Sequence, residues 1–301
     1  MLCHEMVVTV RTSSNVFAGR VAVVTGVGSG IGRALTYELA ARGAVLAVSD
    51  INDSQLDVTA QHARSLGATV QADHLDVTDR PAMLSYAEEV VAHFGAAHLV
   101  INNAGVVHLG DVLGMQFSDI DRVMDTNFWG VVNGTMAFLP HLIASGNAHL
   151  VNISSLFGLI PIPTQSAYVA SKFAVRGFTE SLRIEMLAAK MPLKVTCVHP
   201  GGVNTAIARS GTRNAGARVE GDSSPIGQKL LRMPPEKAAT IILRATSRGR
   251  PRVLVGGDAR AAYLLSSLSR TGWQSLAALS FGRMSAGRSG PGSAGLSRTS
   301  S

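Results

Sequence analysis

The chain of 301 residues is poor in the residue types and spacings that build disulfide frameworks and metal sites. Its two cysteines, Cys3 and Cys197, are too few for a disulfide framework and lack the spacing of a metal-ligand pair. The nine histidines never occur in the H-x-x-x-H arrangement that places two zinc ligands on one helix face. The sequence therefore predicts neither a disulfide scaffold nor a metal centre.

Long apolar runs and targeting signals are also missing. No segment reaches the ~18 uninterrupted apolar residues that a membrane-spanning helix needs. The first residues, MLCHEMVVTVRTSS, lack the basic start and apolar core of a secretory signal. No recognisable nucleic-acid reader motif accompanies the basic residues. We therefore expect a cytoplasmic protein with no nucleic-acid partner.

The positive charge of the chain is confined to its last fifth. The net charge is +7, yet residues 1–243 carry 18 Lys and Arg against 19 Asp and Glu, whereas residues 244–301 carry nine Arg and a single acid, Asp258. The body is close to neutral, and its composition (46% hydrophobic and 16% charged residues for the whole chain) is typical of a globular protein with a sizeable core. We expect one large domain with a tail.

Composition predicts four segments along the chain. Residues 1–17 are expected to form a flexible leader, residues 18–257 the main folded domain, residues 258–283 an amphipathic extension, and residues 284–301 a disordered low-complexity tail. The extension has two interpretations: a membrane-surface helix, or a helix that packs against the body or a sister subunit. We favour packing.

Short buried strands alternate with helical patterns throughout the domain. Strands are expected at residues 21–25, 45–50, 69–76, 98–103, 149–154, 194–200 and 252–256, and helices after the first strand, at 53–66, 79–93, 117–145 and 165–189, and from near Pro235. This alternation predicts an α/β fold: one Rossmann-type, doubly wound parallel sheet of about seven strands with helices on both faces. Residues 202–232, rich in Gly, Ser and Arg, are expected to form a mobile flap over the active site.

A glycine-rich turn connects the first strand to its helix. Gly26, Gly28, Gly30 and Gly32 let the backbone approach a pyrophosphate, and the helix N-terminus supplies free N–H groups. The second strand ends at Asp50, a carboxylate that suits the ribose hydroxyls of NAD and repels the 2′-phosphate of NADP. NAD is therefore favoured, with Arg33 as the residue that could instead receive that phosphate.

Tyr168 and Lys172 lie four residues apart in the helix expected at 165–189 and therefore share one face. A phenol has a pKa near ~10, and a nearby ammonium favours its ionised form. A tuned tyrosine can take a proton from an alcohol or give one to a ketone. Ser155, thirteen residues before Tyr168 and adjacent to Ser154, could donate a hydrogen bond to the same oxygen.

Six motifs in this order resemble those of the short-chain dehydrogenase/reductase family over about residues 18–257. They are the turn TGVGSGIG from Thr25 to Gly32, NNAG at 102–105, Asn127 in DTNFWG, Ser155, the YxxxK pair Tyr168 and Lys172, and PG at 200–201. The leader and the basic C-terminal extension are not part of the family pattern.

The resemblance implies roles for particular residues. It makes Tyr168 the general acid or base, with Lys172 holding the nicotinamide ribose and depressing the pKa of Tyr168, Ser155 bonding the substrate oxygen, and Asn127 positioning a water of a proton relay. The residues that it implies for cofactor binding are Gly26, Ser29, Gly30, Ile31, Gly32, Asp50, Asp76, Val77, Asn103, Tyr168, Lys172, Val203 and Thr205. The resemblance also implies a homodimer or homotetramer built on the helices at 117–145 and 165–189.

The function expected from these residues is an NAD(P)-dependent oxidoreductase that interconverts a secondary alcohol and a ketone or aldehyde. The segment LFGLIPI at 156–162 should line the pocket, and its apolar character favours a lipophilic substrate such as a hydroxysteroid or an alkyl ketone. Two alternatives remain: an NADPH-dependent carbonyl or ketoacyl reductase, and a non-catalytic dinucleotide sensor on the same fold.

Overall fold

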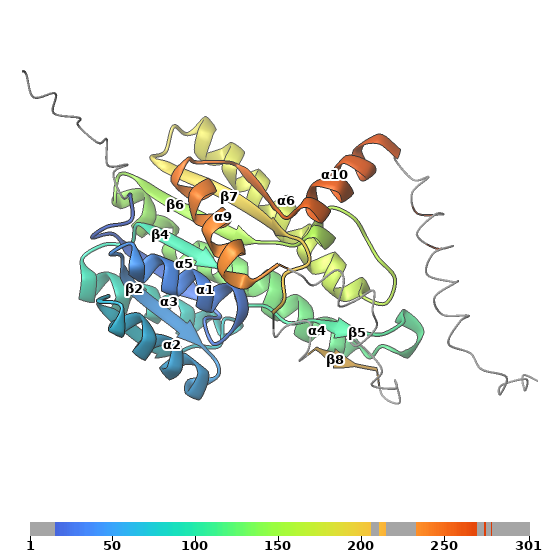
Figure 1. The fold of residues 1–301 in the computed structure, drawn as a ribbon, viewed down its shortest axis with the longest axis horizontal. Coiled ribbons are helices and arrows are strands. Elements are labelled where there is room, and N and C mark those ends of the chain that lie inside the picture. The colour runs from blue at the N-terminus through green and yellow to red at the C-terminus, as the bar shows by residue number, and fades with distance from the viewer. Residues whose placement is uncertain (1–15, 206–210, 215–232, 270–273, 275–277, 279–301) are drawn as a thin grey trace, which may run out of the picture.

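A computed structural model describes residues 16–205, 211–214, 233–269, 274 and 278 (Figure 1). Its main sheet is parallel, with strand order β3-β2-β1-β4-β6-β7-β9. The seven strands are β1 (Val21–Thr25), β2 (Val45–Asp50), β3 (Val70–His74), β4 (Leu99–Asn102), β6 (Ala148–Ile153), β7 (Leu193–Pro200) and β9 (Arg252–Val255). The expected doubly wound sheet is confirmed.

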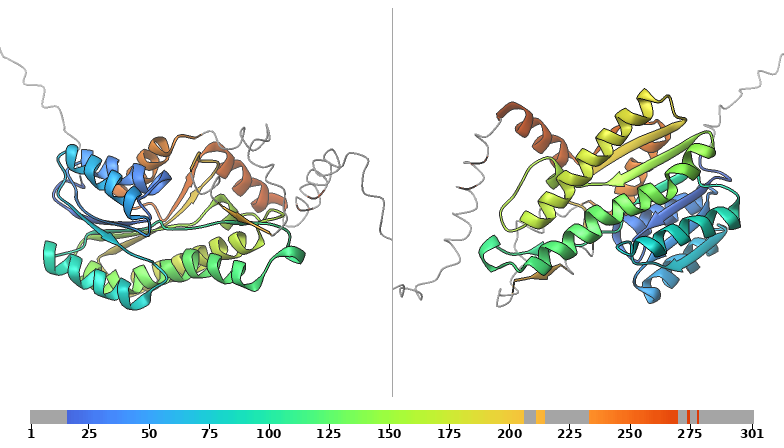
Figure 2. Two further views of the ribbon diagram at one scale, coloured as in Figure 1. Left: turned by 90° about the horizontal axis from the view of Figure 1, so that it is seen from below. Right: turned by 180° about the vertical axis from the view of Figure 1, so that it is seen from behind.

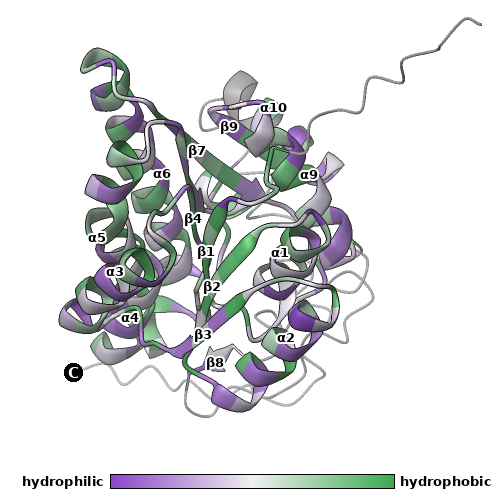
Figure 3. Ribbon diagram, turned by 90° about the vertical axis from the view of Figure 1, so that its left-hand side faces the viewer, coloured by the Kyte–Doolittle hydropathy of each residue, from purple (hydrophilic) through white to green (hydrophobic). Residues whose placement is uncertain are grey.

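Helices cover both faces of this sheet, which gives three layers (Figures 2 and 3). One layer contains α1 (Gly30–Ala41), α2 (Asp53–Ser65) and α9 (Pro235–Ser247). The opposite layer contains α3 (Arg80–Phe94), α4 (Phe117–Met124), α5 (Gly130–Ala144) and α6 (Ser166–Ala188). The helices expected at 53–66, 79–93 and 165–189 agree with α2, α3 and α6 within one residue at each end.

Both faces of the central strands are apolar because both are covered. Every residue of β1 is buried, and its side chains alternate: Ala22 and Val24 join the core beneath α1 and α9, whereas Val21 and Val23 join the core beneath α3 and α5. A strand buried on two sides has no solvent-facing positions, so its sequence is a continuous apolar run. The core also includes Phe17, the last residue of the segment expected to be a leader.

Three local features differ from the expectation. Strand β3 ends at His74, two residues before Asp76, because the Asp76 carboxylate accepts hydrogen bonds from the backbone N–H and the hydroxyl of Thr78 and starts a turn. The long helix expected at 117–145 is interrupted by a π-helical turn, η2 (Asp125–Trp129). A second, two-stranded sheet pairs β5 (His108–Leu109) with β8 (Thr212–Arg213).

The chain after the last strand continues as α10 (Gly257–Ser269), which packs beside β9 and the 3-10 turn η3 (Leu156–Gly158). None of the helices in the described part of the chain is long and apolar enough to cross a membrane. The leader up to residue 15, most of the expected flap (206–210 and 215–232) and most of residues 270–301 lie outside the described residues.

Candidate active site

The cleft opens where the direction of strand addition reverses, between the carboxyl ends of β1 and β4. The turn after β1 and the segment after β4 approach so closely that a Cβ on Gly26 would lie 2.6 Å from the Ala104 Cα. In parallel α/β sheets, the chain segments that follow the two strands at this switch point turn toward opposite faces of the sheet, and the crevice that they leave binds ligands. We call the part of the cleft formed by Gly26–Gly32 and Asp50 the glycine-turn end.

The N-terminus of α1 points its backbone donors at this end of the cleft. Helix α1 begins at Gly30, and its N-cap Ser29 makes no side-chain capping hydrogen bond, nor is there an acidic residue in the first turn. Gly32 has no space for a side chain, since a Cβ there would lie 2.1 Å from the carbonyl oxygen of Gly26. First-turn N–H groups have no partner within their own helix, so the turn suits an anionic group such as a pyrophosphate.

Asp50 is fixed by backbone donors beside the glycine turn. Its Oδ2 accepts from the N–H of Gly28 at 2.7 Å, and its Oδ1 accepts from the N–H of Asn52 at 2.9 Å. Arg33 is half-buried, and its guanidinium donates to Gln55 Oε1 at 2.8 Å, to Thr59 Oγ1 at 3.0 Å and to the carbonyl of Gly28. The anion that faces the cleft here is therefore Asp50, while Arg33 already has several acceptors.

Asn103 connects the ends of β4 and β1. Its Nδ2 donates to the carbonyls of Thr25 at 2.9 Å and Gly26 at 3.0 Å, and its own N–H donates to the Thr25 hydroxyl at 3.1 Å. These bonds fix the conformation of the glycine turn, so Asn103 has a structural task besides lining the cleft. Asp76 and Val77 line the same cleft.

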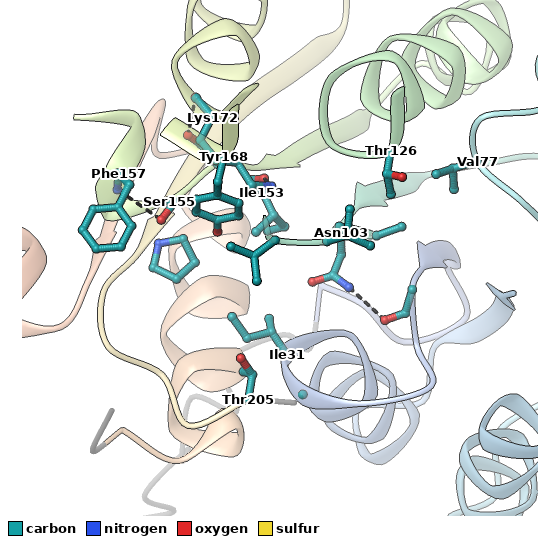
Figure 4. Close-up of a pocket in the computed structure, with 18 of the residues that line it drawn as sticks. Ile31, Val77, Asn103, Thr126, Ile153, Ser155, Phe157, Tyr168, Lys172 and Thr205 are labelled. Atoms are coloured by element: carbon teal, nitrogen blue, oxygen red, sulfur yellow. Dashed lines mark hydrogen bonds between the residues drawn. The ribbon is translucent and has the colours of Figure 1, made fainter. Parts of the chain in front are cut away.

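At the other part of the cleft, which we call the tyrosine end, Tyr168, Lys172 and Ser155 come together from α6 and from the residues after β6 (Figure 4). Lys172 is 3% exposed, its Nζ lies 5.7 Å from the centroid of the Tyr168 ring, and it donates to the carbonyl of Ile153 at 3.0 Å. The spacing of four residues thus places both side chains on the face of α6 that meets the cleft.

The pKa values at the tyrosine end differ from the expectation in one respect. Burial raises the pKa of Tyr168, while the facing Ser155 hydroxyl acts in the opposite direction. Burial lowers the pKa of Lys172 to about 8. The expected depression of the Tyr168 pKa by Lys172 is therefore not a property of this structure, because desolvation of the phenol is the larger influence.

The two neighbouring serines have different surroundings. Ser154 is buried, and its hydroxyl donates to the carbonyl of Lys172 at 2.8 Å. The Ser155 hydroxyl accepts from the N–H of Phe157 at 3.1 Å, at the start of η3. His199, which sequence reasoning missed, donates from Nδ1 to the Ser155 carbonyl at 2.9 Å, and burial lowers its pKa to about 4, so the imidazole is neutral at pH 7.

Asn127 lies behind the cleft, in the π-helical turn η2. It is fully buried, accepts from the N–H of Val106 at 2.7 Å, and donates to the Val106 carbonyl at 2.9 Å and to Ser171 Oγ at 3.0 Å. A Cβ on Gly105 would be 3.0 Å from Asn127 Oδ1 and 3.6 Å from Lys172 Nζ, so both groups border the same glycine. π-Helical turns often mark functional positions, because the extra residue redirects side chains.

Asp258, at the start of α10, is a cleft residue that sequence reasoning assigned to the C-terminal extension. Its Oδ2 accepts from the N–H of Gly202 at 2.5 Å, and a Cβ on Gly201 would lie 2.2 Å from its Oδ1. The carboxylate thus holds the turn that leads to Val203 and Thr205, which line the cleft. Its position in the sequence could have identified it, because Asp258 follows the last strand and therefore lies at the same sheet edge as the other site residues.

The two ends form one continuous cleft of about 1020 Å³. It includes all expected cofactor-binding and catalytic residues except Gly32 and Asn127, namely Gly26, Ser29, Gly30, Ile31, Asp50, Asp76, Val77, Asn103, Ser155, Tyr168, Lys172, Val203 and Thr205. Gly32 and Asn127 lie immediately behind its wall. Within the described part of the chain, no cluster of three or more His, Cys, Asp or Glu side chains could hold a metal ion.

The doubly wound sheet with a cleft at its switch point is the architecture of dinucleotide-binding proteins, and sequence comparison identifies the family. The profile of the family described as short chain dehydrogenase matches residues 20–216. Because the match covers well over half of the chain, the protein belongs to this family.

Individual relatives agree with the assignment. A Mycobacterium tuberculosis protein named "Putative oxidoreductase SadH" is 52% identical over 262 residues, which are 87% of this chain and 95% of that protein. Estradiol 17-beta-dehydrogenase 11 of Macaca fascicularis is 34% identical over 67% of this chain and 68% of its own length. A short-chain dehydrogenase/reductase of Burkholderia phymatum, solved in complex with NAD, superposes with a TM-score of 0.75 at 30% identity, covering 83% of this chain and 94% of that one.

Proposed function

We propose that this protein is an NAD(P)-dependent oxidoreductase that interconverts a secondary alcohol and its ketone or aldehyde, with Tyr168 as the general acid or base. The observation that carries the proposal is the single cleft that joins an uncapped helix N-terminus at the glycine-turn end to Ser155, Tyr168 and Lys172 at the tyrosine end. A dinucleotide needs the first part for its phosphates, and proton transfer to a substrate oxygen needs the second.

In this proposal, different residues bind the cofactor, orient the substrate and transfer the proton. Gly26, Gly30 and the first turn of α1 hold the pyrophosphate, and Lys172 holds the nicotinamide ribose. Ser155 donates a hydrogen bond to the substrate oxygen, and Tyr168 gives that oxygen a proton in reduction or removes it in oxidation. When bound, the nicotinamide ring supplies or accepts the hydride. Asn127, behind the cleft, positions a water that passes protons toward Lys172.

The raised pKa of Tyr168 has a consequence for direction. A phenol that keeps its proton at neutral pH is ready to donate to a carbonyl, so ketone reduction is favoured near pH 7. Alcohol oxidation needs the phenolate and therefore a higher pH. The proposal allows both directions and assigns their pH dependence to one group.

We propose NAD as the preferred cofactor. The carboxylate of Asp50 is held in place by two backbone N–H groups, and its charge opposes a 2′-phosphate. Arg33, the alternative reader of that phosphate, is already bonded to Gln55, Thr59 and the Gly28 carbonyl. The solved relative from Burkholderia phymatum, which contains NAD, supports the same choice.

We propose a lipophilic substrate. The tyrosine end is lined by Val107, Leu109, Leu156, Phe157 and Ile162, which offer few hydrogen-bonding groups for a polyol. The name of the estradiol dehydrogenase among the relatives indicates that the family can act on such molecules. Activity confined to polar polyols would overturn this part of the proposal.

A cofactor titration followed by turnover measurements tests the proposal. Purified protein is titrated with NADH and with NADPH by fluorescence, and then assayed with a panel of apolar secondary alcohols and ketones. Tighter binding of NADH supports the Asp50 argument, and the reverse preference makes the protein an NADPH-dependent carbonyl or ketoacyl reductase. Binding without turnover of any carbonyl or alcohol leaves a dinucleotide sensor.

We also propose that the protein is a homodimer or homotetramer through α5 and α6. Both helices expose large apolar side chains: Met136 on α5 is 65% exposed, and Ile184 and Leu187 on α6 are 65% and 57% exposed. Light scattering of the purified chain and of Ile184→Glu tests this. A monomeric native protein would contradict it. The cytoplasmic location expected from the sequence remains a proposal and is tested by fractionation of cells.

A further inference from the structure

The short strand β5 forms part of the cleft wall, and its side chains alternate between two surroundings. Val107, just before the strand, and Leu109 line the cleft. His108 between them is fully buried and does not line it. Because successive side chains of an extended segment point to opposite sides, whatever holds His108 also fixes the positions of Val107 and Leu109.

Residues 212–214 are bonded to the back of this wall. The N–H of Thr212 donates to the Val107 carbonyl at 3.2 Å, and the N–H of Asn214 donates to the Leu109 carbonyl at 3.3 Å. In Figure 1, β8 lies directly beside β5, below α4. A segment more than 100 residues away in the sequence therefore forms a ladder with the cleft wall.

The Asn214 side chain occupies a space that exists only because two neighbours are glycines. A Cβ on Gly110 would lie 2.2 Å from Asn214 Cγ, and a Cβ on Gly114 would lie 2.7 Å from Asn214 Nδ2. The Nδ2 donates to the Asp111 carbonyl at 3.0 Å, which leaves Oδ1 facing His108 Nε2 at 2.8 Å. A carbonyl only accepts, so this orientation makes Nε2 of His108 a donor.

The other nitrogen of His108 completes the network. Its Nδ1 lies 2.9 Å from the Thr212 hydroxyl and 3.3 Å from Asp119 Oδ1. The Thr212 hydroxyl oxygen accepts a hydrogen bond from the guanidinium of Arg122. His108 is the buried member of this network and both of its ring nitrogens have partners, so its conformation is fixed, because any alternative leaves a buried nitrogen unpaired.

On its other side, the wall is bonded to the apolar loop after η3. The N–H of Gly110 donates to the carbonyl of Thr164 at 2.9 Å, and Thr164 has a φ of 65°, a conformation that is costly for a residue other than glycine. Ile162 and Gln165 from this loop line the cleft. The bond from Gly110 thus joins two parts of the cleft lining that are distant in the sequence, residues 107–109 and residues 162–165.

We infer that His108 and Asn214 are positioning residues that set the shape of the apolar wall at the tyrosine end, and with it the selectivity for large over small substrates. We call this unit, residues 107–110 with 212–214, the wall clasp. The inference rests on the proposed function for its substrate class. A large alicyclic alcohol would contact Val107 and Leu109, whereas a three-carbon alcohol bound at Tyr168 would not reach them.

The sharpest test displaces Asn214 without removing any hydrogen-bonding group. Gly110→Ala places a methyl group where the Asn214 side chain lies. We expect the preference in kcat/KM for cyclododecanol over isopropanol to fall about tenfold, through KM, since pocket contacts of this kind are worth about that much. Asn214→Ala and His108→Ala should act in the same way. His108→Gln, which keeps a donor toward Asn214, should restore part of the preference.

Matched controls separate this effect from general destabilisation. Gly177→Ala adds the same methyl group to an exposed position of α6 with nothing within 4 Å, and light scattering must show that its oligomeric state equals that of the wild type, because α6 belongs to the proposed subunit interface. His149→Asn removes a half-buried histidine that is bonded to Thr196 and lies at the opposite, amino-terminal end of β6. Both should keep the wild-type preference and NADH affinity. An unchanged preference in all clasp variants, or an equal loss for both alcohols, would overturn the inference.

A binding measurement distinguishes failure of the inference from failure of the proposed reaction. Cyclododecanone is titrated into the wild type, Gly110→Ala and Gly177→Ala by calorimetry, and amide exchange is measured for residues 212 and 214. If the protein turns over no alcohol, about tenfold weaker ketone binding with faster exchange in Gly110→Ala alone still supports the clasp. Equal affinity in all three proteins, or no ketone binding by the wild type, overturns it.

Discussion

The glycine-turn end and the tyrosine end of the cleft differ in how their parts are assembled. The first is built almost entirely from residues that directly follow strands: Gly26 after β1, Asp50 at the end of β2 and Asn103 after β4. The second combines α6, the residues after β6, the wall clasp and the start of α10. The first end is therefore defined by sheet topology, whereas the second depends on contacts between distant loops.

In the proposed function, this difference separates recognition of the dinucleotide cofactor from recognition of a particular substrate. Backbone donors of the turn and of α1 require only glycines and a helix start, so they are insensitive to most side-chain changes. The substrate-facing wall depends on individual side chains such as Asn214 and on the glycines that accommodate it. Variation at the tyrosine end can therefore change selectivity while the glycine-turn end stays the same.

The largest effect is expected from removal of the Tyr168 hydroxyl, which changes the tyrosine end alone. We expect Tyr168→Phe to lower turnover by about a thousandfold, in the range that a positioned acid or base contributes, with the NADH dissociation constant within about twofold of wild type. Steady-state kinetics and fluorescence titration measure the two effects. Tyr263→Phe, which removes a hydroxyl bonded to Arg252 outside the cleft, is the matched control. Retained turnover in Tyr168→Phe would contradict the assigned role.

A pH series sharpens the assignment of the tyrosine end. Since the raised pKa of Tyr168 keeps it protonated, oxidation should increase about tenfold per pH unit from pH 6 to about pH 8, while reduction stays constant over this range. Above about pH 8, where Lys172 loses its charge, the increase should flatten. Lys172→Arg, whose guanidinium keeps its charge, should remove that break. Parallel profiles for oxidation and reduction would contradict the assignment.

Neutralising Asp50 tests the other end separately. We expect Asp50→Ala to weaken NADH binding about tenfold, since it loses bonds to the ribose, and to reduce the preference over NADPH, since it removes a like charge from the phosphate site. Titration of both cofactors measures this. Asp53→Ala, an exposed acid three residues later that pairs with His74, should leave the preference unchanged. If Asp50→Ala leaves it unchanged too, Asp50 does not select the cofactor.

The smallest effect is expected at Asp258, which joins α10 to the turn before Val203 and Thr205. Asp258→Ala removes the acceptor of the Gly202 N–H, and we expect about a fivefold increase in the NADH dissociation constant, as for loss of one charge-assisted hydrogen bond outside the direct contacts. Asp258→Asn keeps an acceptor and should recover most of the affinity. Equal effects of both variants would indicate a role for the charge instead of the hydrogen bond.

Much of the architecture follows from local pattern. Strands such as VAVVT are continuous apolar runs because the sheet is covered on both faces, so their positions could be predicted within a residue or two. Tyr168 and Lys172 share a face of α6 because four residues make about one helical turn. The end of β3 was less predictable, because a side-chain turn at Asp76 competes with strand extension.

The pKa of Tyr168 shows where local reasoning fails. Proximity of an ammonium along the helix predicts a lowered value, but how far the phenol is desolvated depends on segments from other parts of the chain. Desolvation opposes ionisation, and here it is the larger effect. The same burial lowers the pKa of Lys172 to about 8, so the charge that the sequence argument relies on is present at neutral pH and is lost as the pH rises above about 8.

The sequence alone was sufficient to predict the parallel sheet, the glycine turn on α1, the carboxylate at the end of β2 and the pairing of Tyr168 with Lys172, because each is indicated by a local pattern of residue types and spacings. Only the tertiary structure decided that Asn214 fits against Gly110 and Gly114, that His108 bonds both Thr212 and Asn214, and that Asp258 reaches Gly202. These contacts join segments separated by more than 50 residues, so a local sequence pattern cannot predict which of these loops come into contact in the folded protein.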